Sequence, residues 1–185
     1  MNLDKVIEAR RSVRRFHSKV PNWRKILDAV NCARKAPLAG NISSLKFILV
    51  DEVEKIAQLA ESSGQKFVAD VHFVLVVVSD TKEVVRSYDE RGEKYANQQA
   101  GAAIENLLLK LTELKLGACW VGAFDDDQVK RILKIPEDSE PVAIIPIGFP
   151  LLKGSQKKKP HLDRCLYFNK YKGKFMKPRV EVDAF

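Results

Sequence analysis

The chain has few of the residues that mark several common classes of protein. Among its 185 residues are three cysteines, Cys32, Cys119 and Cys165, which are far apart and form no C-x-x-C pair. An odd, scattered set of thiols argues against a disulfide framework and against a zinc site. The three histidines are isolated as well, so we expect no metal site.

Long apolar runs are also lacking. The longest, residues 73–78, is far shorter than the roughly 20 residues that a membrane-spanning helix needs. Residues 1–5 lead into an amphipathic segment instead of the apolar core of a secretion signal. We therefore expect no membrane association and a cytoplasmic location.

Several catalytic and nucleotide-binding motifs are missing from the sequence. There is no G-x-G-x-x-G, no G-x-x-x-x-G-K-[ST] and no G-x-S-x-G. Their absence argues against a Rossmann fingerprint, a P-loop and a serine nucleophile elbow.

Positive charge is what the chain has in excess, with a formal net charge of +8 and a sequence pI near 9.4. The basic residues gather at residues 10–15 and again at residues 157–159. Both clusters could hold phosphate. Charge alone leaves open an anionic cofactor, a nucleic acid, an acidic surface or mere solubility.

The apolar pattern predicts one domain, because 185 residues with 45% apolar side chains are enough for one substantial core. Helices are expected at residues 3–7, from an Asn22 cap through Trp23, Ile26, Leu27 and Val30, at residues 53–61, at residues 100–111 with Gly117 as the C-cap glycine, and after an Asp125 cap. Strands are expected at residues 47–50, 73–78, 118–121 and 142–147, and residues 179–182 are a further candidate; residues 81–97 show no clear pattern. Helices and strands alternate, so the class is α/β or α+β.

The segment Arg10-Arg11-Ser12-Val13-Arg14-Arg15-Phe16 is the most informative in the chain. If it is extended, Arg10, Ser12 and Arg14 share one side. Guanidinium forks bind phosphate in bidentate fashion and a hydroxyl adds a donor, so this side could cradle an anion. The alternative is the solvated basic end of a helix.

Two segments of small residues add to this picture. In Ala39-Gly40-Asn41, the glycine lets the backbone approach a flat ligand and the asparagine amide can pair with a heterocycle edge. Gly122 and Ala123 could present backbone N–H groups. Each segment alone could equally be an ordinary turn. Together with the arginine segment they form the parts of a cofactor pocket without a protein nucleophile.

Taken in order, these segments resemble the nitroreductase family of FMN enzymes. The opening R-R-S-V-R-R-F resembles the family's R-x-S-x-[RK] phosphate segment, and A-P-L-A-G-N at residues 36–41 resembles its A-P-S-A-G-N loop. L-G-A-C-W-V-G-A-F-D at residues 116–125 is similar to G-L-G-T-C-W-I-G-A-F-D, and P-V-A-I-I-P-I-G-F-P at residues 141–150 to P-V-A-L-L-P-L-G-Y-P. The similarity covers roughly residues 6–160.

The resemblance implies an α+β fold with a central, mainly antiparallel sheet flanked by helices, in an interlocked homodimer with FMN at the subunit interface. One domain would span residues 1–185, with a core of about 1–160 and an extension, 161–185, on the partner subunit. By similarity the cofactor-binding residues would be Arg10, Arg11, Ser12 and Arg14 for the phosphate and ribityl end, Lys158 as the late cation (Lys157 or Lys159 if the register slips), Ala39 and Asn41 from the partner, Gln65 and Lys66 near the pyrimidine ring, and Gly122 and Ala123 near flavin N5.

The implied activity is hydride transfer from NADH or NADPH, through the flavin, to a small organic acceptor such as a nitroaromatic or a quinone, with no catalytic side chain. Ser43-Ser44-Leu45 stands where many members have Q-P-W, and Gln99 occupies a position that is often acidic. The resemblance therefore does not identify the electron acceptor. A specialised flavin enzyme, such as a dehalogenase, a dehydrogenase or a flavin-fragmenting enzyme, is the alternative within the family. A basic nucleic-acid-binding module is the alternative outside the family. The chain shows no exposed series of aromatic residues on which bases could stack, which argues against this alternative.

Overall fold

A computed structural model describes residues 2–151 and 159–173. The chain divides into two compact units, Met1–Gly154 and Ser155–Phe185. The first unit contains the sheet and the long helices, and the described part of the second contains the 3-10 turn η4 (Leu162–Arg164). Lys157, Lys158 and the candidate strand at residues 179–182 lie outside the described residues.

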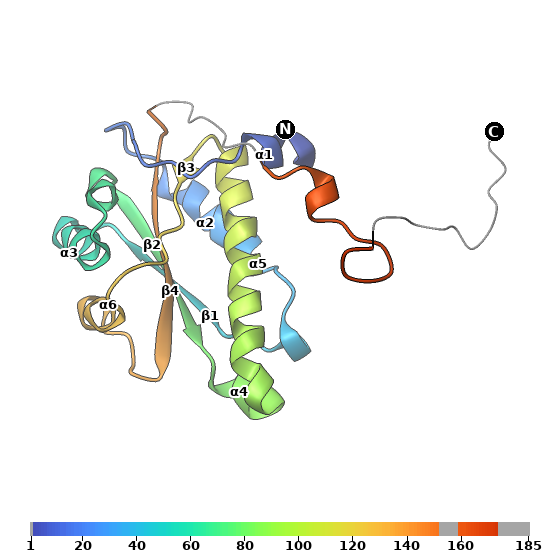
Figure 1. Cartoon of the computed structure of the whole chain (residues 1–185). Coiled ribbons are helices and arrows are strands. Elements are labelled where there is room, and N and C mark those ends of the chain that lie inside the picture. Colours follow the sequence, from blue (N-terminus) through green and yellow to red (C-terminus); the bar gives the residue numbers. More distant parts are fainter. Residues whose placement is uncertain (1, 152–158, 174–185) are drawn as a thin grey trace. The chain divides into compact units, whose positions relative to one another are not determined.

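The centre of the first unit is an antiparallel sheet (Figure 1). Its strands are β1 (Leu45–Val50), β2 (Phe73–Asp80), β3 (Gly117–Ala118) and β4 (Ser139–Gly148), and their spatial order is β1-β2-β4-β3. All three pairings are antiparallel, with Leu75 of β2 opposite both Leu49 and Ile145. The predicted buried strand therefore lies between two neighbours, and the predicted mainly antiparallel sheet is confirmed.

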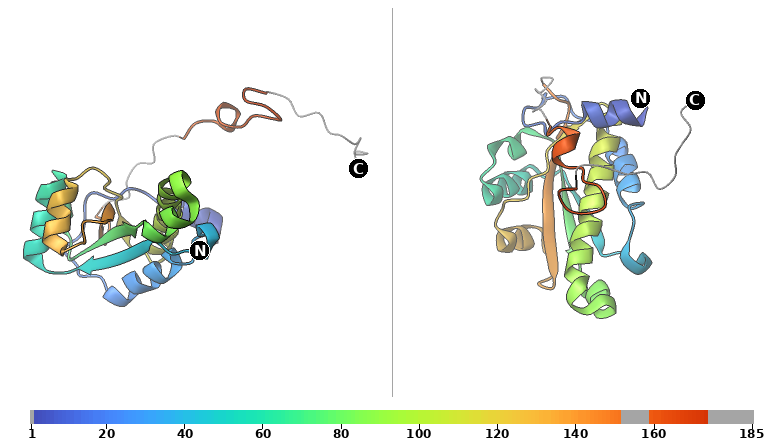
Figure 2. Two further views of the ribbon diagram at one scale, coloured as in Figure 1. Left: turned by 90° about the horizontal axis from the view of Figure 1, so that it is seen from below. Right: turned by 45° about the vertical axis from the view of Figure 1, so that its right-hand side comes forward.

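Helices cover both faces of this sheet (Figures 1 and 2). The helices are α1 (Leu3–Ala9), α2 (Trp23–Ala33), α3 (Val53–Ser63), α4 (Lys82–Tyr88), α5 (Gly92–Glu113) and α6 (Asp126–Leu133), with 3-10 turns η1 (Ala39–Asn41), η2 (Lys66–Asp70) and η3 (Asp89–Arg91). Figure 1 shows α2 and α5 on one side of the sheet and α3 and α6 on the other. This arrangement confirms the predicted α+β class.

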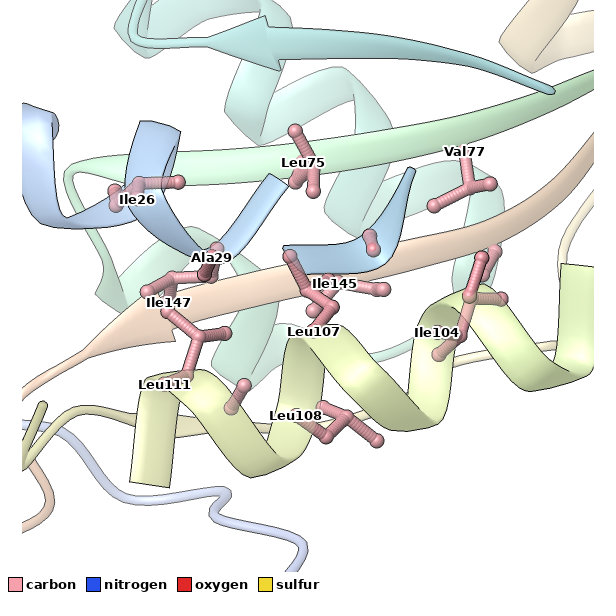
Figure 3. Packing of buried hydrophobic residues seen from close by; sticks show 14 of the residues in the cluster. Ile26, Ala29, Leu75, Val77, Ile104, Leu107, Leu108, Leu111, Ile145 and Ile147 are labelled. Carbon is pink, nitrogen blue, oxygen red and sulfur yellow. The ribbon is translucent and has the colours of Figure 1, made fainter. Parts of the chain in front are cut away.

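The two layers of core follow from the alternation of side chains along β2. Successive residues of a strand point to opposite faces of the sheet. Leu75 and Val77 thus join the cluster under α2 and α5, whereas Val74, Val76 and Val78 join the cluster under α3 and α6. Figure 3 shows the first cluster, in which α5 presents a row of buried leucines and Ile104 to the sheet. A run of β-branched residues is stable here because both faces are covered.

Both predicted N-caps are confirmed, and the predicted buried stripe of α2 is confirmed for two of its four residues. The side-chain oxygens of Asn22 and Asp125 accept the backbone N–H groups of Arg24 (3.0 Å) and Gln128 (2.9 Å). Trp23 and Leu27, which we placed in the buried stripe, are 46% and 45% exposed, respectively. Ile26 is buried as predicted and Val30 packs partly buried against the core, and the other buried positions are Ala29 and Ala33. Small alanines permit close packing against α5, and that packing turns the two large side chains outward.

Three further predictions around α5 need correction. Residues 81–97, which lack a clear apolar pattern, form α4, η3 and the first turns of α5. The pattern is hidden because Gly92 and Ala96 occupy the buried positions of α5 there in place of large apolar residues. Gly117 is not a C-cap: α5 ends at Glu113, and Gly117 begins β3. That strand is shorter than predicted, although Val121 still pairs with Ile144 of β4 through a single bridge.

Among the described residues, 2–151 and 159–173, no helix combines the length and the apolar character needed to cross a bilayer.

Candidate functional site

The arginine segment becomes extended directly after α1. Arg10 is the C-cap of that helix, with φ −59° and ψ 133°, and the chain then runs beside the sheet. Ser12 forms a parallel bridge with Ala118, the N–H of Val13 donates to the Ala118 carbonyl at 2.9 Å, and Phe16 bridges to Pro150. The sequence left open an extended segment or the basic end of a helix, and the structure shows an extended segment after Arg10.

Gly117 allows this segment to lie so close to β3. A Cβ atom added at Gly117 would be 2.8 Å from Cγ2 of Val13, which is closer than real Cβ contacts permit. A side chain at Gly117 would therefore push the arginine segment away from the sheet. The glycine is required by packing, not by an unusual backbone dihedral.

Arg14 and Arg10 make their contacts on different elements. The guanidinium carbon of Arg14 is 5.9 Å from the ring centroid of Phe67 in η2. Burial raises the pKa of the Cys119 thiol, and the charge and a hydrogen bond of the Arg14 guanidinium oppose that rise. Nε of Arg10, in contrast, lies 3.3 Å from the carboxylate of Glu105 on α5.

Arg11 leaves one buried donor without a partner. Its Nη1 donates to the backbone carbonyls of Glu8 and Arg10, the latter at 2.7 Å. Its Nε is buried and has no hydrogen-bond partner within the part of the chain that the structure describes. Buried donors are nearly always paired, so the unpaired Nε of Arg11 favours the presence of a ligand at the arginine segment.

Gln65, Lys66, Gly122 and Ala123 lie in two segments that meet at the end of α3. Gly64 ends that helix with φ +61°, and Gln65 follows. Lys66 then begins η2, and Phe67 of η2 contacts Arg14. The N–H of Asp125 donates to the Ser62 carbonyl at 2.9 Å, which ties the loop at residues 122–125 to the same end of α3. Gly122 and Ala123 are exposed. Three of the predicted segments are therefore brought together within one chain.

The fourth segment, η1 with Ala39 and Asn41, makes its contacts with α4 and α5. Gly40 and Asn41 both have positive φ angles, 57° and 59°. A Cβ atom at Gly40 would lie 2.6 Å from the Tyr88 hydroxyl. An open pocket of about 290 Å³ lies beside this segment and is lined by Pro37, Leu38, Ala39, Tyr95, Gln98, Gln99 and Ala102.

The remaining predicted residues are the late lysines. Lys157 and Lys158 lie outside the described residues, and Lys159 is exposed in the second unit. The sequence-based reasoning did not identify Phe67 or Tyr88, which contact the arginine segment and η1, respectively. For Phe67, the available signal was its place directly after Gln65 and Lys66. For Tyr88, the sequence offered no signal.

Comparison with known proteins identifies the class of protein. The family model described as the nitroreductase family matches residues 7–67 and 61–149, which is well over half of the chain. The chain belongs to the nitroreductase family.

Individual relatives agree with this assignment. A protein of Methanothermobacter thermautotrophicus named as an NADH dehydrogenase or NAD(P)H nitroreductase is 30% identical over 158 residues, 81% of this chain and 78% of the relative. A protein of Methanocaldococcus jannaschii named as a nitroreductase is 35% identical over 105 residues, and the match spans 57% of this chain and about half, 52%, of the relative. The NADPH:FMN oxidoreductase of Vibrio harveyi, solved with NAD+, superimposes with a TM-score of 0.84 at 20% identity over 92% of this chain and 76% of that one.

Family membership confirms the predicted class of enzyme. The chain is an oxidoreductase of the type that depends on FMN and NAD(P)H. The electron acceptor, the residues that hold the cofactor and the number of subunits are a separate matter.

Proposed function

We propose that the chain is a homodimeric FMN enzyme that oxidises NADH or NADPH and reduces a small organic acceptor such as a nitroaromatic or a quinone. The observation that carries the proposal is the meeting of Arg14, the turn after α3 and the loop after β3 around one end of α3. These segments supply positive charge, amide and ammonium groups, and an exposed stretch of backbone with small side chains.

The residues present fit a flat cofactor that carries a phosphate. The Arg14 guanidinium and the unpaired Nε of Arg11 are donors suited to a phosphate, and Ser12 lies exposed between them in sequence. At the other end of the site, Gly122 and Ala123 have little or no side chain to hold a ring system away from their N–H groups. Gln65 and Lys66 offer donors for the edge of that ring system.

Bound FMN supplies the redox chemistry, taking hydride from NAD(P)H and passing electrons to the acceptor. The chain's own residues bind and orient. Arg14 holds the anionic end in place, and the exposed loop at residues 122–123 leaves one side of the ring system open for a second flat molecule. No side chain is required as a general base.

The location of η1 supports a site shared between two subunits. Its contacts are on α4 and α5, whereas the other three segments gather at α3. A second copy of the chain could present Ala39 and Asn41 to the site of the first. Large apolar side chains that α1 and α2 leave exposed, among them Leu3, Ile7, Trp23 and Leu27, are suited to a subunit interface.

An absorption spectrum tests the proposed cofactor and activity directly. We expect purified protein, incubated with FMN and desalted, to retain the visible bands of an oxidised flavin. Anaerobic addition of NADH or NADPH should bleach these bands, and a nitroaromatic or a quinone should restore them. A preparation that keeps no flavin after incubation, or a bound flavin that neither dinucleotide reduces, would contradict the proposal.

Mixed dimers test whether two subunits share each site. We expect Arg14→Ala and Asn41→Gly to weaken flavin binding when each variant is alone; glycine keeps the positive φ that Asn41 adopts. If each site uses Arg14 from one subunit and Asn41 from the other, a heterodimer of the two variants contains one intact site. Differently tagged chains that are co-expressed and purified through both tags should then regain about one tightly bound flavin per heterodimer.

Sites built within a single chain give the opposite result. Each site of the heterodimer would then carry one defect, and mixing would restore no flavin. A monomeric molecular mass for the FMN-loaded protein in sedimentation would also contradict the shared site.

A further inference from the structure

The buried amide of Gln99 lies where α5 faces η1. Gln99 is 3% exposed and belongs to the long helix that spans one face of the sheet. In the orientation that satisfies its neighbours, its amide N–H₂ donates to the Ile42 carbonyl at 3.2 Å and to the Ser44 hydroxyl at 3.3 Å, and its carbonyl oxygen accepts the N–H of Ala39 at 3.1 Å. One side chain thus holds both ends of the segment that contains Gly40 and Asn41.

This segment needs such support because its own backbone is unusual. Two consecutive residues with positive φ are uncommon, and the second, Asn41, has a Cβ atom. The internal hydrogen bonds are those of a short 3-10 turn, from Asn41 to Leu38 at 3.3 Å and from Ile42 to Ala39 at 3.0 Å. The additional contacts come from outside, from Gln99 on α5 and from the Tyr88 hydroxyl beside Gly40.

The polar groups behind Gln99 continue into the sheet. The Ser44 hydroxyl lies 3.5 Å from the Ser79 hydroxyl of β2, and both serines are buried. The carbonyl of Ser44 also accepts the N–H of Asp80 at 2.7 Å. Gln99 therefore connects the segment to two elements, α5 and β2, and a change at this position alters the support of Ala39 and Asn41.

We propose that Gln99 is a positioning residue of the flavin site, which fixes Ala39 and Asn41 in the conformation that contacts FMN. The inference rests on the proposed function, since it assigns those two residues to the flavin. It explains why an amide is suited to this position: the contacts require a donor toward Ile42 and an acceptor toward Ala39 on the same planar group. An ionised carboxylate accepts only, and its negative charge would lie against the carbonyl of Ile42.

Replacing Gln99 with Glu tests the inference. A positioning role predicts an FMN affinity that depends on pH, whereas a simple loss of packing does not. A protonated carboxyl group has one donor and one acceptor, so it can replace the amide, whereas the ionised form cannot. Burial favours the neutral form and raises the pKa of such a carboxyl group. The groups around the amide are backbone groups and serine hydroxyls, and the titratable side chains on the packed elements are Tyr88 beside Gly40, Tyr95 beside the adjoining pocket, and Asp80, whose N–H donates to the Ser44 carbonyl.

The measurement is the FMN dissociation constant of Gln99→Glu relative to wild type as a function of pH, by flavin fluorescence. We expect the ratio to be near one in mild acid and to rise about tenfold or more at mildly alkaline pH, because the ionised carboxylate loses the hydrogen bond to the Ile42 carbonyl and places its charge against that oxygen. Taking the ratio removes the titration of the FMN phosphate itself. Asn97→Asp, on an exposed residue of the same helix, is the matched control, and its ratio should stay constant.

A ratio for Gln99→Glu that does not change with pH, or that changes equally in Asn97→Asp, would overturn the inference. A second measurement does not depend on FMN. In the flavin-free protein, Gln99→Leu should speed the hydrogen exchange of the Ala39 amide relative to wild type and to Asn97→Leu. If wild type binds no FMN, the proposed function fails; if it binds FMN and Ala39 exchanges equally in all three, Gln99 does not position the segment.

Discussion

Replacing Arg14 with alanine is expected to weaken FMN binding about 10- to 150-fold. The guanidinium supplies charge-assisted hydrogen bonds to the phosphate, and bonds of this kind contribute about 1.5–3 kcal/mol. Arg14 is held over Phe67 and close to Cys119, so the group is placed before the ligand arrives. The measurement is the FMN dissociation constant from fluorescence titration.

Arg15 provides the matched control for this prediction. It is the next residue, it is exposed, and its backbone carbonyl accepts the N–H of Leu151 at 3.0 Å whatever its side chain is. Arg15→Ala should therefore leave FMN affinity within about twofold of wild type, whereas Arg14→Lys should recover part of the loss because it keeps the charge. Equal affinities in Arg14→Ala and wild type would place the phosphate elsewhere.

Replacing Leu107 with alanine is expected to lower the free energy of unfolding by about 2–5 kcal/mol, because it opens a cavity at a fully buried site. Leu107 lies on α5 among Leu75, Ile145 and Ile147, and neighbours from the helix and the sheet surround it (Figure 3). Since a rigid surrounding cannot collapse around the gap, we expect the upper part of this range. Urea denaturation at constant protein and FMN concentration measures the change.

Val53→Ala is the comparison for the core variant. Val53 is 76% exposed at the start of α3, so its replacement should change the free energy of unfolding by no more than about 0.5 kcal/mol. Keeping concentrations constant matters because ligand binding and association both shift the apparent stability. A loss below about 1 kcal/mol in Leu107→Ala would mean that α5 is not the core helix of the fold.

Much of the fold could be predicted because its strongest signals are local. The run at residues 73–78 predicts a strand covered on both faces, and both the antiparallel neighbours and the two clusters confirm it. The caps at Asn22 and Asp125 depend on a side chain reaching its own helix, so no distant residue is involved. What failed was also local: an apolar pattern cannot reveal the first turns of α5, whose buried positions are Gly92, Ala96 and Gln99.

The candidate site was predictable segment by segment but not as an arrangement. The three motifs point to a phosphate cradle and two small-residue loops. Alternation along an extended chain predicts that Arg10 and Arg14 share a side, yet Arg10 pairs with Glu105 on α5 and Arg14 packs over Phe67. Which neighbour each arginine meets depends on residues about 50 to 100 positions away, and no spacing in the sequence contains that information.

The sequence by itself determined the family, the excess of positive charge, the alternation of helix and strand, and which residues begin two of the helices. Only the tertiary structure decided that α2 turns Trp23 outward, that Gly117 is needed for the approach of Val13, and that Gln99 reaches across to Ala39. The reason is physical. Propensity, capping and periodicity act between residues a few positions apart, whereas these three outcomes depend on which surfaces meet when the sheet and its helices pack.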